Sequence, residues 1–247
     1  MISNLILNDF IFFLRNINIS ARYITIKDKV RVITELYINL LKISFIFIIL
    51  STIVVVINKS EVFIDTDKLV RVSSKTLYAF LVLIVGPIYE ELSYRYFLTK
   101  FEKRKFIISS SLLLSYFLFI LIKSGLFYFE GVSYLCHYYG YLFAFGVIFY
   151  ISLNLIIRNN ILLTIRNIWD KYFYIIFYIV SFLFVINHLI ESMYSSLIIE
   201  VRYMMLIPLL IYSLMVGFVR IKLNFTCAIL FHILFNLPSV IIKLFVA

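Results

Sequence analysis

Long apolar runs, separated by short polar segments, dominate the pattern of hydrophobic and polar positions along this chain. Seven runs approach the roughly 20 residues that a helix needs to cross a bilayer, and they lie near residues 37–58, 76–99, 106–123, 134–157, 172–191, 203–219 and 225–246. Apolar residues are continuous within each run rather than alternating, and open sheet edges cannot face lipid, so strands are excluded. The pattern predicts an all-α, polytopic transmembrane helical bundle of about seven spans, within a range of six to eight.

The segment before the first predicted span has only a short apolar run. Residues 5–14, LILNDFIFFL, are too few to cross a bilayer and predict an interfacial helix. Gly and Pro number only 6 and 3, which argues against a flexible linker and a second domain. We therefore expect an N-terminal amphipathic, cytoplasmic segment over 1–36 and one transmembrane bundle over 37–247.

Composition and charge narrow the environment and the partners. Of the 247 residues, 64% are hydrophobic and 15% are charged, whereas soluble domains carry about 25% charged residues. The net charge of +10 does not indicate a nucleic-acid partner, because the basic residues lie in short loops between apolar runs. Loops on the side of the N-terminus carry fourteen Lys and Arg against seven on the other side, which predicts a cytoplasmic N-terminus. The membrane that we expect is a bacterial inner membrane. Trp169, with nearby tyrosines, is interpreted as part of an aromatic belt at the membrane interface.

A few polar side chains interrupt the apolar runs, although an ionisable residue inside a span costs roughly 3 kcal/mol. They fall in the second, fifth and seventh predicted spans and comprise Glu90, Glu91, Arg95, Asn187, His188, His232 and Asn236. Glu91 and Arg95 are four residues apart, in the favourable order for an ion pair on one helix face. Glu90 lies about 100° round the helix, so it points elsewhere and is not paired by Arg95. Just before them, Gly86-Pro87 is expected to loosen the helix and let another backbone or a substrate approach.

This set of side chains suits the hydrolysis of an acyl group by water. A Glu held among apolar side chains is well placed to act as a general base. Two histidines either bind a metal through neutral imidazoles or orient the water directly, and an Asn amide can donate to a developing oxyanion. The zinc-peptidase motif HExxH does not occur in the sequence, so the residues leave the question of a metal open.

Three short motifs follow one another in these spans. EExxxR appears as EELSYR over 90–95, FxxxH as FVINH over 184–188, and HxxxN as HILFN over 232–236. In this order they resemble the CAAX protease and bacteriocin-processing (CPBP, or Abi) family, which includes the type II CAAX prenyl endopeptidases. The resemblance covers roughly residues 76–240, and its most specific part is the Glu pair followed by Arg inside an apolar helix.

The resemblance implies an intramembrane endopeptidase, a hydrolase that cleaves peptides near a membrane-embedded or lipidated end. Its expected partners are membrane lipid and a peptide or lipidated-protein substrate. By motif position the resemblance implies that Glu90 is the activating base and that Glu91 supports it. It implies that His188 and His232 bind a metal or position the water. Asn236 would stabilise the oxyanion, and Arg95 would anchor the glutamate helix. If the protein is a metalloprotease, the expected ligands are His188, His232 and Glu90, with Zn²⁺ or another divalent ion as the cofactor.

Two other functions share these sequence features. A catalytically silent CPBP-like protein would act as a membrane scaffold or a bacteriocin-immunity protein through protein contacts. A small transporter would use the charged residues as a proton relay, but the sequence contains neither an inverted repeat nor paired broken helices. Intramembrane proteolysis is therefore the leading hypothesis from the sequence.

Overall fold

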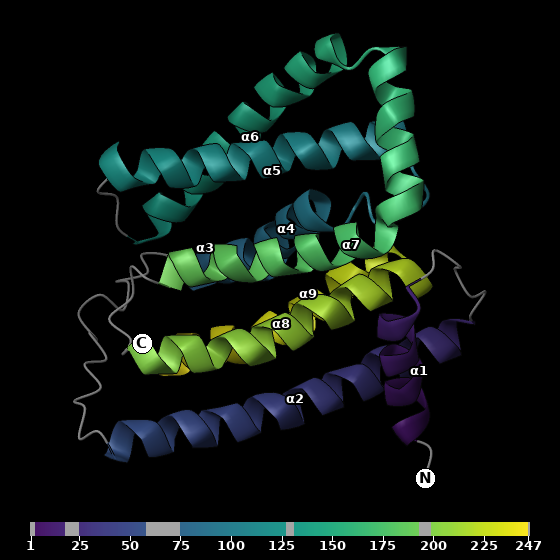
Figure 1. Cartoon of the computed structure of the whole chain (residues 1–247). Helices are drawn as coiled ribbons and strands as arrows, with labels where there is room; N and C mark the ends of the chain where they lie inside the picture. The colour runs from purple at the N-terminus through teal and green to yellow at the C-terminus, as the bar shows by residue number, and fades with distance from the viewer. Residues whose placement is uncertain (1–2, 18–24, 58–74, 127–130, 193–198, 247) are drawn as a thin grey trace. The chain divides into compact units, whose positions relative to one another are not determined.

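The computed structural model describes residues 3–17, 25–57, 75–126, 131–192 and 199–246, which are helical apart from short turns (Figure 1). No strand occurs within these ranges. The predicted all-α class is therefore confirmed. The elements in chain order are α1 (Ser3–Arg15), α2 (Ile26–Ile57), α3 (Lys75–Phe80), the π-helical segment η1 (Leu81–Val85), α4 (Gly86–Tyr94), α5 (Lys103–Leu126), α6 (Gly131–Ile156), α7 (Asn159–Ser192), α8 (Ile199–Lys222) and α9 (Phe225–Val246).

Helices long and apolar enough to cross a bilayer number seven among the described residues, and each overlaps one predicted span. The polytopic transmembrane bundle is thus confirmed. The stretches are Ile26–Val54, Lys75–Tyr94, Lys103–Ile122, Cys136–Ile156, Asn159–Ile190, Tyr203–Lys222 and Phe225–Ile242. A helix over Ser3–Arg15 also matches the one expected at 5–14, and its position at the membrane interface stays a prediction.

Three helix boundaries differ clearly from those that the apolar pattern predicted. α2 begins at Ile26 rather than near residue 37, so it extends into the segment 1–36 that was expected to precede the first span. The second span ends at Tyr94, before the expected residue 99, because the chain turns at Arg95 (φ −132°, ψ −13°). α7 begins at Asn159 rather than near 172, and it contains a kink where Tyr172 leaves helical geometry (φ −117°, ψ 22°). The kink separates a shorter first part of α7 from its longer, apolar second part.

The chain divides into two compact units, and α7 and α9 each contribute to both. Unit 1 comprises Met1–Asp67 and Tyr174–Phe231. In it α2 packs against α8, and α1 contacts both helices. Phe13 of α1 lies edge-on to Phe177 and Phe218, with ring centroids 5.4 and 5.2 Å apart. A Cβ at Gly217 would meet the Phe177 ring at 2.6 Å, so only glycine lets this ring lie against α8.

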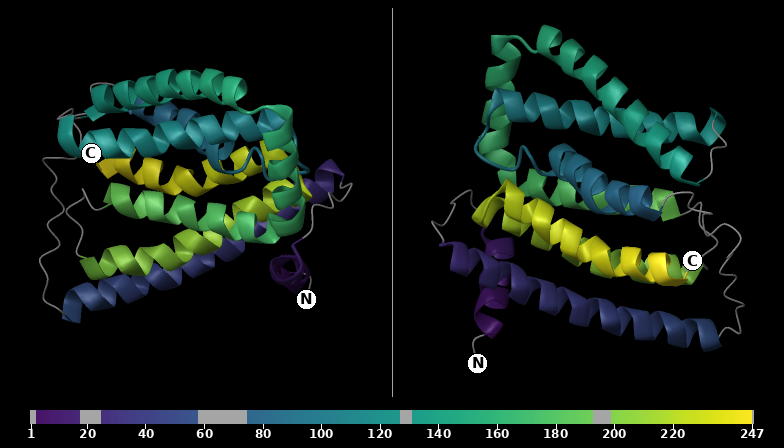
Figure 2. Two further views of the ribbon diagram at one scale, coloured as in Figure 1. Left: turned by 45° about the horizontal axis from the view of Figure 1, so that its top comes forward. Right: turned by 180° about the vertical axis from the view of Figure 1, so that it is seen from behind.

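Unit 2 comprises Lys68–Phe173 and His232–Ala247. In it α3, η1 and α4 follow one another as one span, α4 packs against α5, and α5 packs against α6. The core between these helices is mainly aromatic and consists of Tyr89, Tyr116, Phe119, Tyr138 and Leu142. Figures 1 and 2 show the first part of α7 running across the direction of α5.

Candidate active site

The helix that carries the glutamates changes its hydrogen-bonding pattern just before them. Pro87 has no N–H, and its ring would clash with the carbonyl four residues earlier in a regular α-helix. The chain accommodates this with the π-helical turn Leu81–Val85, in which the N–H of Gly86 bonds to the Leu81 carbonyl. Single π-helical turns inside α-helices are frequent at functional sites. The loosening expected at Gly86-Pro87 is therefore present and takes this form.

Gly86 also admits a close neighbour from α6. A Cβ at this position would lie 2.7 Å from the hydroxyl oxygen of Tyr139, closer than real Cβ atoms approach other atoms. The sequence predicts that a backbone or a substrate approaches here, and within unit 2 the approaching group is a side chain. The glycine thus lets Tyr139 reach the helix one turn before the glutamates.

One stripe of α9 lies along the glutamate helix. His232, Asn236, Val240 and Leu244 recur every four residues and so share one helix face. His232 contacts the glutamates, Asn236 Nδ2 donates to the Val82 carbonyl at 3.3 Å, Val240 packs in one cluster with Tyr78 and Leu81, and the Leu244 carbonyl accepts from Lys75 Nζ at 3.1 Å. Positions later in α9 meet positions earlier in the span, so the two run antiparallel. This register brings His232 to Glu90 and Glu91.

The charged centre of this interface comprises Glu90, Glu91, Arg95 and His232. Arg95 Nη1 donates to Glu91 Oε1 at 2.6 Å, which is the ion pair predicted from the sequence. His232 Nδ1 lies 2.8 Å from the same oxygen, and His232 Nε2 lies 3.6 Å from Glu90 Oε2. Glu91, Arg95 and His232 are 0%, 1% and 2% exposed, whereas the Glu90 side chain is 17% exposed. Glu91 is therefore enclosed, and Glu90 is the more accessible carboxylate.

These contacts determine how the His232 ring is used. A carboxylate oxygen can only accept, so the short Nδ1 contact to an ionised Glu91 places the ring proton on Nδ1. In the neutral imidazole Nε2 is then an acceptor that faces Glu90 Oε2. Two acceptors held 3.6 Å apart require a proton donor or a cation between them, or a proton on one of them. A water that bonds both atoms would lie beside the line that joins them, in contact with a base and with an oriented imidazole.

The glutamate helix is held from its other side by hydroxyl groups of α5, which sequence reasoning missed. The Tyr89 hydroxyl lies 2.6 Å from Ser115 Oγ and donates to the Leu112 carbonyl at 3.1 Å. Ser109 Oγ donates to the Leu92 carbonyl at 2.6 Å. Small serine side chains let membrane helices approach closely. The signal was a row of serines on α5, which is hard to recognise in a chain rich in Tyr and Ser.

The turn after Arg95 is held by Trp169, in the first part of α7. Trp169 Nε1 donates to the Thr99 carbonyl at 3.1 Å. Its ring is 4% exposed and packs against Phe97, with centroids 5.2 Å apart. Trp169 is thus a buried packing residue, and its place in an aromatic belt at the membrane interface stays a prediction. It positions the segment that carries Arg95.

His188 lies in unit 1, on the second part of α7. Its Nδ1 is 3.0 Å from the Phe184 carbonyl oxygen. Its ring is tilted by 37° against that of Phe184, the first residue of the FxxxH motif, with ring centroids 4.3 Å apart. A carbonyl only accepts, so Nδ1 carries the proton and Nε2 is the acceptor nitrogen of the neutral ring. His188 and His232 thus share one tautomer, and the approach of His188 to Glu90 stays a prediction.

The donors of unit 2 can be compared with the needs of a metal ion. Two ligands about 2.1 Å from a tetrahedral zinc ion lie about 3.4 Å apart, close to the 3.6 Å between His232 Nε2 and Glu90 Oε2. Catalytic zinc sites use three protein ligands, and no group of three His, Cys, Asp or Glu converges among the residues that the structure describes. Two donors do not complete such a site, so we derive no step through a metal.

Comparisons of this chain with protein-family models, with curated proteins and with solved structures found no match. The features of this chain that bear on its function are therefore the three motifs and the geometry around Glu90 and His232.

Proposed function

We propose that this protein is an intramembrane endopeptidase of the CAAX-protease type, in which Glu90 and His232 activate a water molecule. The observation that carries the proposal is the pair of acceptors 3.6 Å apart, one of them on a histidine whose other nitrogen is bonded to Glu91. Residues from two motifs that are far apart in the sequence meet here inside membrane-spanning helices. A purely structural ion pair would need Glu91 and Arg95 but not Glu90.

Each residue has a distinct role in the proposed reaction. Glu90 removes a proton from the water as its oxygen attacks the peptide carbonyl carbon, and then delivers that proton to the leaving amine nitrogen. His232 Nε2 orients the water, while Glu91 keeps the proton of His232 on Nδ1. Arg95 balances the charge of Glu91 and fixes its side chain.

Two more residues complete the proposed site. Asn236 uses one amide N–H on the Val82 carbonyl, and its second N–H is the proposed donor to the oxyanion of the tetrahedral intermediate. His188, carried by unit 1, is proposed as the second histidine at the water. If the enzyme binds Zn²⁺, the proposed ligands are His188, His232 and Glu90, and the ion would supply Lewis-acid activation.

The proposed substrates are peptides of membrane-associated proteins, cut near an embedded or lipidated end. Support comes from the place of the glutamates, which lie within the candidate span Lys75–Tyr94. A soluble peptide would have to leave water to reach them. The proposed location is the bacterial inner membrane with the N-terminus in the cytoplasm.

The test is peptide cleavage by the full chain reconstituted in liposomes, with a library of quenched fluorescent membrane peptides as substrate. Glu90→Gln keeps the side-chain size and removes the base, so we expect a loss of cleavage of about 10²- to 10⁴-fold. Glu102→Gln is the matched control, because Glu102 is 53% exposed in a solvent-side pair with Lys105. Both variants should elute and unfold like the wild type.

Two outcomes decide between the functional hypotheses. Cleavage that is lost in Glu90→Gln and retained in Glu102→Gln supports the peptidase. Cleavage at the wild-type rate by a folded Glu90→Gln variant contradicts the peptidase hypothesis. A cellular phenotype that survives Glu90→Gln would favour a silent scaffold or immunity protein instead. Bound metal, measured in the purified protein with and without chelator, tests the zinc proposal separately.

A further inference from the structure

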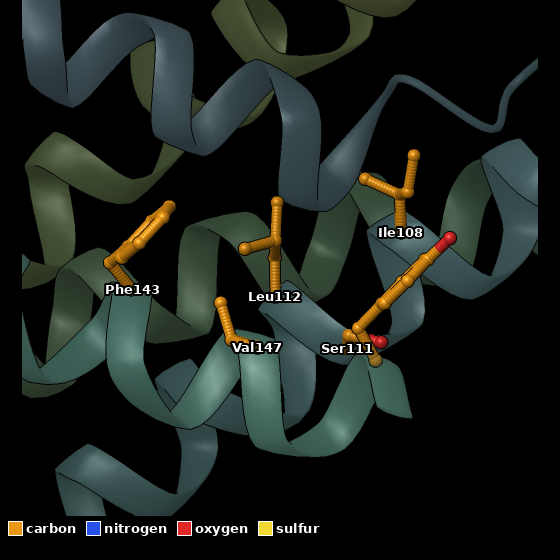
Figure 3. Close-up of a pocket in the computed structure, with 7 residues that line it drawn as sticks. Ile108, Ser111, Leu112, Phe143 and Val147 are labelled. Carbon is orange, nitrogen blue, oxygen red and sulfur yellow. The ribbon is translucent and has the colours of Figure 1, made fainter. Parts of the chain in front are cut away.

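An apolar groove lies between α5 and α6 in unit 2, away from the glutamates. It encloses about 150 Å³ and is lined by Ile108, Ser111, Leu112, Phe143, Gly146, Val147 and Tyr150. Figure 3 shows Ile108 and Leu112 of α5 beside Phe143 and Val147 of α6, with all four side chains pointing toward the same side. An apolar cavity of about this size accommodates a molecule such as benzene, so the groove can take a length of one hydrocarbon chain.

Gly146 brings the two helices together at the floor of the groove. A Cβ there would lie 3.0 Å from Leu112 Cδ2. The groove walls remain open to the outside, since Phe143 is 68% and Val147 43% exposed. Both helices are candidate membrane spans, so the surroundings of this groove are lipid chains rather than water.

A basic residue lies at one end of the same face. Arg104 is four residues before Ile108 and seven before Ser111, so the three share one face of α5. Arg104 is exposed, and no ion pair to it is found within the described part of the chain, whereas the neighbouring Lys105 is paired with Glu102 at 2.5 Å. One guanidinium group can bind two oxygens of the same phosphate at once. Charge at the end of an apolar groove matches the two parts of an anionic phospholipid.

A second cation and a hydroxyl group also suit an anionic phospholipid at this groove. α6 ends at Ile156 and is followed by the exposed Arg158, and the figures show the end of α6 and the start of α5 at the same end of unit 2. Tyr150 adds a hydroxyl group to the lining of the groove. Basic pockets between membrane helices commonly bind lipid head groups.

We propose that the α5–α6 groove binds one anionic phospholipid, with an acyl chain against Leu112 and Val147 and its phosphate at Arg104 and Arg158. The Tyr150 hydroxyl donates to a glycerol ester carbonyl. The site adjoins the glutamate helix, because the Leu112 carbonyl also accepts the Tyr89 hydroxyl. The proposal does not depend on peptidase activity.

The test is native mass spectrometry of the full chain released from detergent, titrated with dioleoyl phosphatidylglycerol or dioleoyl phosphatidylcholine. We expect preferential binding of one phosphatidylglycerol. Arg104→Gln should weaken it about fivefold, the effect of one basic residue at a membrane surface, whereas Arg166→Gln, which changes an arginine 64% exposed on α7, should leave it unchanged. Val147→Trp fills the groove and should weaken binding at least as much, in contrast to Ile148→Trp on the next, outward position.

A second measurement on the wild type keeps the proposal testable if Val147→Trp does not fold. Dihexanoyl phosphatidylglycerol carries the same head group on short chains and should bind much more weakly than the dioleoyl lipid. Equal binding of the two head groups overturns the proposal. Equal effects of Arg104→Gln and Arg166→Gln also overturn it, because Arg104 would then not bind the phosphate. Equal binding of long- and short-chain phosphatidylglycerol overturns it as well, because the groove would then not bind the acyl chain.

Discussion

Replacing Arg95 by Met keeps a long side chain but removes the guanidinium that bonds Glu91. The two side chains are 1% and 0% exposed, and Nη1 lies 2.6 Å from Oε1. Unit charges about 4 Å apart attract by about 4 kcal/mol at an effective dielectric constant near 20, and loss of one partner of a buried pair costs about 3–5 kcal/mol. Because His232 still bonds Glu91 at 2.8 Å, we expect Arg95→Met to lower the free energy of unfolding by about 3 kcal/mol.

A double-mutant cycle separates the ion pair from general damage to packing. Glu91→Gln alone leaves Arg95 buried without its counter-ion and should also destabilise. The double variant E91Q/R95M removes both charges of the pair, and replacing a buried ion pair by uncharged residues is often close to neutral. We therefore expect it to be at least about 2 kcal/mol more stable than additivity of the single variants.

Unfolding can be followed in mixed micelles with the single tryptophan, Trp169, which lies buried near the turn after Arg95. Asp170→Asn is the control, because its pair with Arg166 spans 3.8 Å with both side chains more than half exposed, so its effect should stay within about 0.5 kcal/mol. If Arg95→Met were no more damaging than Asp170→Asn, or the double variant no better than additive, the buried pair would not hold this helix.

Three further changes test the packing around the site. Gly86→Ala places a Cβ 2.7 Å from the Tyr139 hydroxyl oxygen and should lower the free energy of unfolding by about 1–3 kcal/mol, with partial recovery in G86A/Y139F. The control is Gly140→Ala, where nothing lies within 4 Å of the added Cβ, and it should be neutral or stabilising. Equal melting temperatures of the two glycine variants would contradict the close approach of Tyr139. Asn236→Leu leaves a carbonyl of the π-helical turn without its donor and should cost about 1–3 kcal/mol; an unchanged thermal midpoint would show that this bond contributes little. Trp169→Phe keeps the ring packing and loses one hydrogen bond, so circular dichroism should report a loss of about 1 kcal/mol, and a loss several times larger would point to ring packing instead.

The spans were predictable from the sequence because the length of an apolar run alone indicates a membrane helix. The end of the second span was not, because nothing local stops it at Tyr94. The carbonyl of Thr99 is bonded by Trp169, which is 70 residues away in the sequence. Gly86-Pro87 did indicate a disturbed helix, but nothing local specifies its π-helical form or the bond from Asn236 to the Val82 carbonyl inside it.

The candidate site was predictable where spacing along one helix determines the contact. The Glu91–Arg95 pair follows from an interval of four residues on α4 and the turn after it. The bond from His232 to Glu91 was not predicted, because it depends on the register between α9 and the glutamate span. Hydroxyl contacts such as Tyr89 to Ser115 were missed for the same reason, since two helices must pack before such polar atoms meet.

The most direct measurement for the proposed site is peptide cleavage in water enriched in oxygen-18, analysed by mass spectrometry of the products. If Glu90 activates a water molecule, each new carboxyl terminus made by the wild type carries one heavy oxygen, and these products disappear with Glu90→Gln. Labelled products formed at the same rate by the wild type and by folded Glu90→Gln would contradict the proposed role of Glu90 and His232.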